Sequence, residues 1–117
     1  MPAVVYLVDD LFFVAKIRDA AAQVGVEVER AADPAGLAAL AAAGARLAIV
    51  DLRRGDALAA LERLAADPGM RDVRTVGFVD HERVDAMESA RAHGCAVVLS
   101  KRRFATDLPG LLAACRI

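Results

Sequence analysis

Short apolar runs alternate with longer segments of helical periodicity along the whole chain. Most of the short runs are apolar almost throughout, as strands covered on both faces are. The run at 26–31 instead alternates apolar and charged residues, which is typical of an edge strand with one solvated face. The pattern predicts five strands, at 3–8, 26–31, 47–50, 73–79 and 96–99.

Local signals mark where the predicted helices begin and end. The first helix is expected to end at Gly25, which suits a helix C-terminus. Asp33 and Pro34 predict the start of the second, because Asp accepts hydrogen bonds from free amides and Pro needs no donor in the first turn. Gly44 closes that helix. The remaining helices are expected to bury Leu58, Leu61, Leu64 and Ala65, then Val84, Met87 and Ala90, and finally Leu108, Leu111, Leu112 and Cys115.

Five successive strand–helix units predict a parallel sheet with helices on both faces, in one domain over residues 1–117. Because strand–helix–strand connections are almost always right-handed, few topologies remain possible. We expect the doubly wound order 2-1-3-4-5, a flavodoxin-like α/β sandwich of three layers. Ligands of such sheets bind outside the carboxyl ends of the strands, where the strand order reverses, between strands 1 and 3.

Charged residues gather at the predicted carboxyl ends of the strands. Asp9 and Asp10 follow the first strand, Asp51 ends the third, and Lys101 follows the fifth. Crowded carboxylates favour a cation, their oxygens suit Mg2+, and an Asp at such a site can form an aspartyl phosphate. Taken singly, Asp10 is better explained as a helix cap and Lys101 as a solvated lysine. We expect a metal-suited pocket because one crevice receives all four residues.

Composition narrows the choice of partner and compartment. The 117 residues are 57% hydrophobic and carry a formal net charge of −1. Neither nucleic acid nor a membrane is therefore expected as a direct partner. No segment approaches the ~20 apolar residues that span a bilayer, and the N-terminus lacks a signal-peptide pattern. Cys95 and Cys115 lack metal-type spacing, so we interpret them as reduced thiols of a cytoplasmic protein.

With these residues in order on five strand–helix units, the chain resembles the receiver domain of bacterial response regulators. The resemblance extends over essentially the whole chain and rests on Val8-Asp9-Asp10, Ile49-Val50-Asp51, Gly94-Cys95-Ala96 and Ser100-Lys101. It implies a module of two-component phosphorelay signalling and not an enzyme. By resemblance, Asp51 is the phosphoacceptor, Asp9, Asp10 and Asp51 hold Mg2+, and Lys101 pairs with the phosphoryl group.

Four positions depart from the family pattern and make this an atypical member. Val79 stands where the family has a Ser or Thr hydroxyl, and Asp80 stands at the next, commonly small position. Asp80 would discourage an incoming anion, or would simply cap the fourth helix. Val98 replaces the aromatic switch residue. Arg102 replaces the Pro that the family joins to Lys101 through a cis peptide, and a cis bond before any other residue costs ~2.5–4 kcal/mol.

Two further residues lie beside the expected pocket. Arg53 is two positions past Asp51. We hypothesise that it pairs with Asp51 or Asp80 as an internal counter-ion, with a solvated arginine as an equally good alternative. Phe12 is expected to be exposed, because Phe13 fits the buried stripe. It would cover the pocket or contact a partner protein.

The sequence leaves three functions open. The first, which the sequence favours, is an atypical stand-alone receiver that accepts a phosphoryl group at Asp51 with Mg2+. The second is a pseudo-receiver, a protein-interaction module that works without phosphorylation. The third is a small flavodoxin-like enzyme or nucleotide binder, which is disfavoured because no Gly-rich phosphate loop follows the first strand.

The expected partners follow from the same resemblance. Upstream, we expect a histidine kinase or a phosphotransfer protein. Downstream, we expect a protein partner or a second copy of the chain on the surface formed by the fourth helix, fifth strand and fifth helix. This surface is predicted to include Arg83, Met87, Arg91, Arg102, Arg103 and Phe104.

Overall fold

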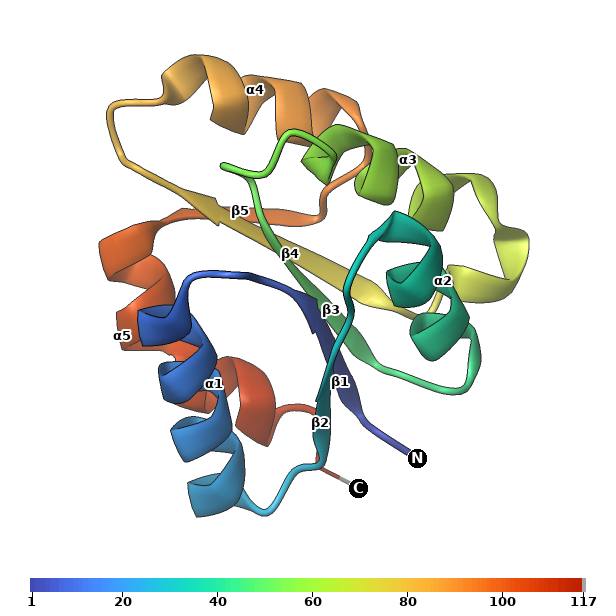
Figure 1. Cartoon of the computed structure of the whole chain (residues 1–117), viewed down its shortest axis with the longest axis vertical. Helices are drawn as coiled ribbons and strands as arrows, with labels where there is room; N and C mark the ends of the chain where they lie inside the picture. The colour runs from blue at the N-terminus through green and yellow to red at the C-terminus, as the bar shows by residue number, and fades with distance from the viewer. Residues whose placement is uncertain (117) are drawn as a thin grey trace.

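The computed structural model describes residues 1–116 and contains one five-stranded sheet flanked by helices (Figure 1). All neighbouring strands pair in parallel, in the order β2-β1-β3-β4-β5. The predicted fold class and strand order are thereby confirmed. In chain order the elements are β1 (Val4–Leu7), α1 (Leu11–Val24), β2 (Val28–Arg30), α2 (Pro34–Ala42), β3 (Leu47–Asp51), α3 (Ala57–Ala66), the 3-10 helix η1 (Pro68–Met70), β4 (Arg74–Val79), α4 (Val84–Ala92), β5 (Val97–Ser100) and α5 (Lys101–Ala113).

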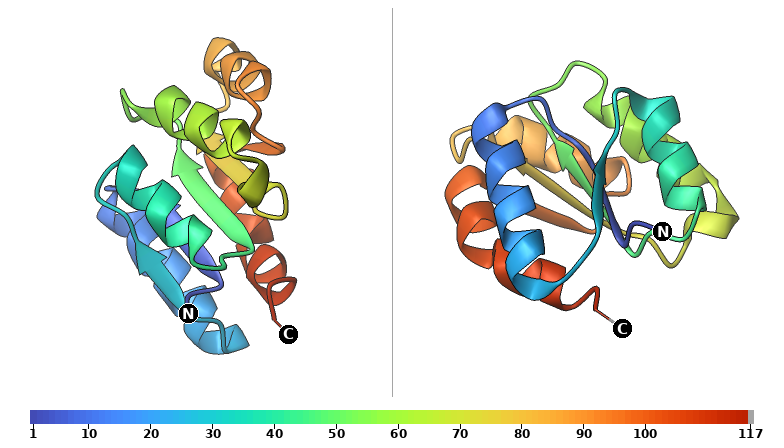
Figure 2. Two further views of the ribbon diagram at one scale, coloured as in Figure 1. Left: turned by 90° about the vertical axis from the view of Figure 1, so that its right-hand side faces the viewer. Right: turned by 60° about the horizontal axis from the view of Figure 1, so that its bottom comes forward.

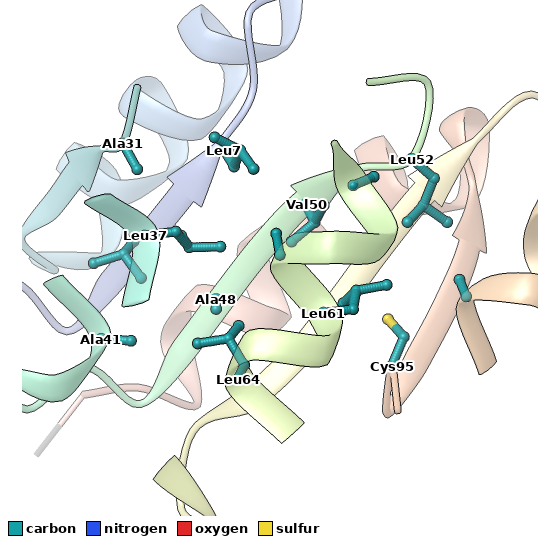
Figure 3. Packing of buried hydrophobic residues seen from close by; sticks show 14 of the residues in the cluster. Leu7, Ala31, Leu37, Ala41, Ala48, Val50, Leu52, Leu61, Leu64 and Cys95 are labelled. Atoms are coloured by element: carbon teal, nitrogen blue, oxygen red, sulfur yellow. The ribbon is translucent and has the colours of Figure 1, made fainter. Parts of the chain in front are cut away.

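The sheet separates two hydrophobic cores. Helices α1 and α5 lie side by side on one face, while α2, α3 and α4 cover the other (Figures 1 and 2). Every residue of β1 and β3 is buried, which explains why those runs are apolar throughout. Strand β2 is an edge strand with exposed Glu29 and Arg30, as its alternating pattern predicted. Figure 3 shows the core under α2 and α3, where Leu37, Leu61 and Leu64 pack against Ala48 and Val50.

The predicted helix boundaries have the expected local causes. Gly25 ends α1 in the left-handed region at φ 74°, a conformation that favours glycine. The Asp33 carboxylate accepts a hydrogen bond from the Gly36 amide at 2.7 Å, with Pro34 as the first residue of α2. Ser100 caps α5 in the same way by accepting from the Arg103 amide at 3.1 Å. Lys101 is consequently the first residue of a helix.

Helix α4 differs from its prediction. Its first residue is Val84, Arg83 occupies the N-cap position, and Asp80 makes no cap there. The predicted capping role of Asp80 is therefore wrong. Only Ala90 of α4 is buried, and Val84 is 56% exposed, although its spacing placed it in the apolar stripe. Helix α4 therefore buries less of its apolar stripe than periodicity alone implied.

Phe104 lies in the core and not on the contact surface where the sequence placed it. Its side chain has no solvent-exposed area. It stacks on Phe78 of β4, with ring centroids 4.3 Å apart and planes 9° apart, and Phe13 of α1 packs 4.8 Å from Phe78. These three rings, the aromatic stack, join α1, β4 and α5 beneath the carboxyl edge of the sheet. Such pairs add about 0.5–1.5 kcal/mol beyond the area they bury.

Within residues 1–116, no helix combines the length and the apolar character needed to cross a bilayer.

Replacing Gly77 of β4 by a larger residue is expected to destabilise the fold. A Cβ at this position would meet Leu52 Cδ2 at 2.8 Å and Leu52 Cγ at 3.0 Å. Gly77→Ala should therefore lower the free energy of unfolding by about 1–3 kcal/mol through overpacking, measured by urea denaturation.

Gly110 of α5 provides the matched control. A Cβ there meets nothing within 4 Å. Gly110→Ala should therefore leave stability unchanged or raise it by up to about 1 kcal/mol. Equal effects of the two substitutions would contradict the close contact between Gly77 and Leu52.

Candidate functional site

Charged side chains from all five strand ends meet at the carboxyl edge of the sheet. Asp9 and Asp10 follow β1, which lies directly beside β3 with Asp51 as its last residue. Asp80 follows β4, and Lys101 follows β5. The strand order thus brings the predicted residues to one edge, at the point where the order reverses. Their pairing differs from the one expected of a metal pocket.

Asp51 is the buried centre of this edge, because its side chain is only 5% exposed. The guanidinium of Arg53 grips both of its oxygens: Nε donates to Oδ1 at 2.9 Å and Nη2 to Oδ2 at 2.7 Å. The backbone amide of Arg53 also donates to Oδ1 at 3.0 Å. Two parallel, charge-assisted hydrogen bonds are the strongest arrangement between these groups. The hypothesis that Arg53 is an internal counter-ion of Asp51 is confirmed, whereas its alternative partner Asp80 is not used.

The same guanidinium connects Asp51 to Asp10. Nη2 of Arg53 donates to Asp10 Oδ2 at 3.0 Å, while Asp10 Oδ1 accepts from the Phe12 amide at 2.9 Å. Asp10 therefore caps α1 and pairs with Arg53 at once. The hydrogen bond from Arg53 holds the pKa of the Asp10 carboxyl below its usual value. The hydrogen bond to Asp51 is the main reason that the pKa of Arg53 is raised, so the guanidinium is permanently charged.

Asp9 does not pair with Arg53 and belongs to a second group of ion pairs. Its side chain is 64% exposed, and its oxygens accept from Arg30 at 3.1 Å and from Arg54 at 2.6 Å. Arg54 also holds Asp56 at 2.8 Å. The hydrogen bond from Arg54 lowers the pKa of Asp56, and the bond to Asp56 raises the pKa of Arg54. Asp9 is thus paired with two arginines, neither of which is the partner of Asp10 or Asp51.

Lys101 pairs with Asp80 and not with Asp51. The Nζ atom of Lys101 lies 2.6 Å from Asp80 Oδ1, and this contact is the main cause of the lowered pKa of Asp80. Residues 1–116 contain no cis peptide bond, so the bond before Arg102 is trans. The cis bond that the resemblance implies before position 102 is thus not found, and Lys101 contacts Asp80.

The two positions that lack the family's switch residues are apolar and packed. Val79 is fully buried in the core beneath α3 and α4, and Val98 of β5 is half-buried against the same core. Val98 lies opposite Gly77 in the register of the sheet. Neither side chain offers a hydrogen-bond donor. Neither side chain is therefore able to hold an oxygen atom attached to Asp51.

The carboxylates at this edge do not fit Mg2+ as they are arranged. Mg2+ requires oxygen ligands at about 2.0–2.1 Å in near-octahedral geometry. All four oxygens of Asp10 and Asp51 instead accept from N–H groups of Arg53 or Phe12. In the part of the chain that the structure describes, no group of three or more His, Cys, Asp or Glu side chains is placed to hold a metal ion.

Sequence reasoning missed two of the arginines. Arg54 and Arg30 hold Asp9, but neither stood out as a site residue. Arg30 ends β2, the neighbour of β1, so the strand order contained a usable signal for its pairing with Asp9. The consecutive Arg53 and Arg54 directly after a strand that ends in Asp were the other signal.

The rim of this edge bears exposed apolar side chains. Phe12 is 62% exposed, as predicted, and Leu11 is 74% exposed. The ammonium group of Lys16 lies 5.0 Å from the centre of the Phe12 ring. Phe13, not Phe12, is the ring nearest Arg53, whose guanidinium carbon lies 5.9 Å from its centre.

Comparison with known proteins gives a likeness in structure only. Neither a protein-family model nor a curated protein sequence matches the chain. The receiver domain of the sensor histidine kinase PA1611 from Pseudomonas aeruginosa PAO1, solved with magnesium coordinated in its active site cleft, matches with a TM-score of 0.80 and 17% identity, covering 97% of this chain and 95% of that one.

Two receiver domains of other bacteria give similar values. The signal receiver domain of NarL from Mycobacterium tuberculosis has a TM-score of 0.77 at 21% identity, covering 97% of this chain and 94% of its own. The receiver domain of NtrX from Brucella abortus has a TM-score of 0.75 at 20% identity, covering 96% of each chain. The chain therefore has the receiver fold of response regulators. At the carboxyl ends of its strands, arginine side chains pair with the acidic ones.

Proposed function

We propose that this chain is a receiver-type module of two-component signalling that acts through protein contacts without being phosphorylated. The observation that supports this best is the guanidinium of Arg53, which holds both oxygens of Asp51 and one of Asp10. A permanent positive charge thus stands where a phosphoacceptor would need a metal ion. The likeness to receiver domains supports the signalling role.

Three features oppose phosphoryl transfer to Asp51. An attacking carboxylate oxygen must be free, whereas both oxygens here accept hydrogen bonds from Arg53. Transfer also depends on cations that neutralise the phosphoryl oxygens, but Lys101 is engaged by Asp80 at 2.6 Å. The Asp80 carboxylate itself repels an approaching anion. Each feature weakens the reaction, and together they favour the pseudo-receiver.

The absence of a switch agrees with this proposal. Val79 and Val98 fill the positions where the resemblance places a hydroxyl and an aromatic ring. Both pack against the core beneath α3 and α4. A phosphoryl group at Asp51 would find no hydroxyl there to draw the following loop inward. Recognition would instead depend on a fixed surface.

That surface is the face formed by α4, β5 and α5. Arg83, Arg91, Arg102 and Arg103 are all exposed there. A concentration of guanidinium groups favours an acidic face of a partner protein, or of a second copy of the chain. We expect no direct contact with nucleic acid or membrane. The buried, free thiols of Cys95 and Cys115 suit a reducing compartment, which we take to be the cytoplasm.

A second candidate is the phosphoaccepting receiver, with Mg2+ and a histidine kinase or phosphotransfer protein as its donor. The position of Asp51 favours it, since this carboxylate ends the central strand β3 at the switch point of the sheet. The PA1611 receiver domain, which has the same fold, holds magnesium in its active site cleft. This candidate requires Arg53 to leave Asp51 whenever a phosphodonor binds.

Exposure to a small phosphodonor separates the two candidates. After incubation with Mg2+ and acetyl phosphate, the wild-type chain should gain no phosphoryl group, because Arg53 occupies both oxygens of Asp51. Intact-mass spectrometry at acidic pH, where acyl phosphates survive, measures the outcome. Asp51→Asn is the control and should likewise show no phosphoryl adduct. A base-labile mass gain in wild type that is absent from Asp51→Asn would sink the proposal.

The pairing of Asp10 with Arg53 should make the stability of the fold depend on pH in the acid range. The lowered pKa of Asp10 means that its pairing stabilises the folded state at pH values above the usual carboxyl pKa. That contribution is lost as the pH falls through the lowered pKa of the folded state. Asp10→Asn keeps the helix cap but removes the charge. Urea denaturation at a series of pH values should therefore show a shallower acid decline for Asp10→Asn than for wild type.

The Arg53→Ala variant tests the same pair from the other side. It too should show a shallower acid decline, because the Asp10 carboxylate loses the partner that lowers its pKa. If both variants decline as steeply as wild type, Arg53 is not the partner that matters to Asp10 in solution.

A further inference from the structure

We propose that Arg53 is the resident cation of this site, and that removing its guanidinium alone uncovers a divalent-cation site between Asp10 and Asp51. The inference deepens the proposed function and rests on it, since the pseudo-receiver is closed because Arg53 is present. It assigns to one side chain the exclusion of metal from an otherwise oriented pair of carboxylates.

One nitrogen atom of Arg53 contacts both carboxylates. Nη2 of Arg53 lies 2.7 Å from Asp51 Oδ2 and 3.0 Å from Asp10 Oδ2. A single positive group thus touches one oxygen from each carboxylate, one of them following β1 and the other ending β3. A metal ion that bridges these carboxylates would take the same space. Arg53 and a divalent ion are therefore mutually exclusive here.

The second step concerns what remains when the guanidinium is removed. Asp10 Oδ1 accepts from the backbone amide of Phe12 at 2.9 Å, and Asp51 Oδ1 accepts from the backbone amide of Arg53 at 3.0 Å. Neither bond involves the Arg53 side chain, so both survive its truncation. Each carboxylate keeps one oxygen fixed by the main chain and presents the other to the vacated space. Such preorganisation is what a ligand pair for a cation needs.

The third step is competition between the tethered arginine and a free ion. Arg53 is only two residues from Asp51, so its effective concentration at the site is on the order of millimolar or above. Its charge is permanent, and its guanidinium packs over the ring of Phe13 at 5.9 Å. Without it, two neighbouring carboxylates repel each other, which favours a divalent ion. Mg2+ commonly uses one or two carboxylates and keeps several waters, so Asp9 is not required.

Mg2+ binding should therefore depend on residue 53. In isothermal titration calorimetry near neutral pH, Arg53→Ala should bind one Mg2+ at least about tenfold more tightly than wild type, the scale on which neighbouring groups change metal affinity. Arg53→Lys keeps the charge but loses the two parallel donors of the guanidinium, so its Mg2+ affinity should lie between those of wild type and Arg53→Ala. Adding Mg2+ should raise the unfolding temperature of Arg53→Ala and leave that of wild type unchanged.

Two controls locate the effect. Arg103→Ala also breaks an arginine–aspartate pair, the one with Asp107 at 2.9 Å on α5, and should bind Mg2+ as weakly as wild type. Asp51→Asn combined with Arg53→Ala should abolish the gain. If Arg53→Ala is folded by circular dichroism and gains no affinity, the inference is overturned. Tight binding by wild type overturns it as well, with no need for the variant to fold.

The outcomes remain distinct from those that decide the proposed function. Failure of the inference appears as unchanged Mg2+ affinity in Arg53→Ala, whereas failure of the proposed function appears as acyl phosphate on wild-type Asp51. A wild-type chain that stays unmodified while Arg53→Ala gains no metal site would retain the pseudo-receiver and remove Arg53 as its cause.

Discussion

A carboxylate buried at the end of a central strand must be paired, because taking an ionised group out of water costs several kcal/mol unless another charge and good hydrogen bonds compensate. Asp51 is such a group, with 5% of its side chain exposed. Its partner is supplied from only two residues further along the chain. The arrangement at the carboxyl edge depends on that choice, because the guanidinium that neutralises Asp51 also reaches Asp10 and thereby joins the ends of β3 and β1.

The pairing continues from strand to strand. Beyond Asp10, Asp9 is held by Arg30 from β2 and by Arg54 from the loop after β3. At the other side, Asp80 after β4 holds Lys101 at the start of α5. Each carboxylate of this edge thus has a cation from the chain itself. The carboxylates at this edge of the sheet are therefore neutralised by ion pairs within the chain.

The aromatic stack gives this edge its support from below. Arg53 packs over Phe13, which contacts Phe78 of β4, and Phe78 stacks on Phe104 of α5. β5 has Val98 where the family pattern places an aromatic ring. Phe104, in the following helix, is buried in the core beneath α1 and α5, on the other face of the sheet from Val98. The rings beneath Arg53 therefore connect it to α5 without Val79 or Val98, which pack in the core on the other face of the sheet. The connection is made by three phenyl rings, which carry no hydroxyl group.

By itself the sequence determined the elements, their order and the edge at which the acids gather, because hydrophobic periodicity, helix caps and right-handed crossovers are local or nearly local rules. It also indicated Arg53 as a counter-ion without deciding between Asp51 and Asp80. The tertiary structure alone decided the partners, since ion pairing depends on the direction of long side chains across neighbouring strands. It paired Lys101 with Asp80 and joined Asp9 to both Arg30 and Arg54, pairings that spacing along the chain does not fix.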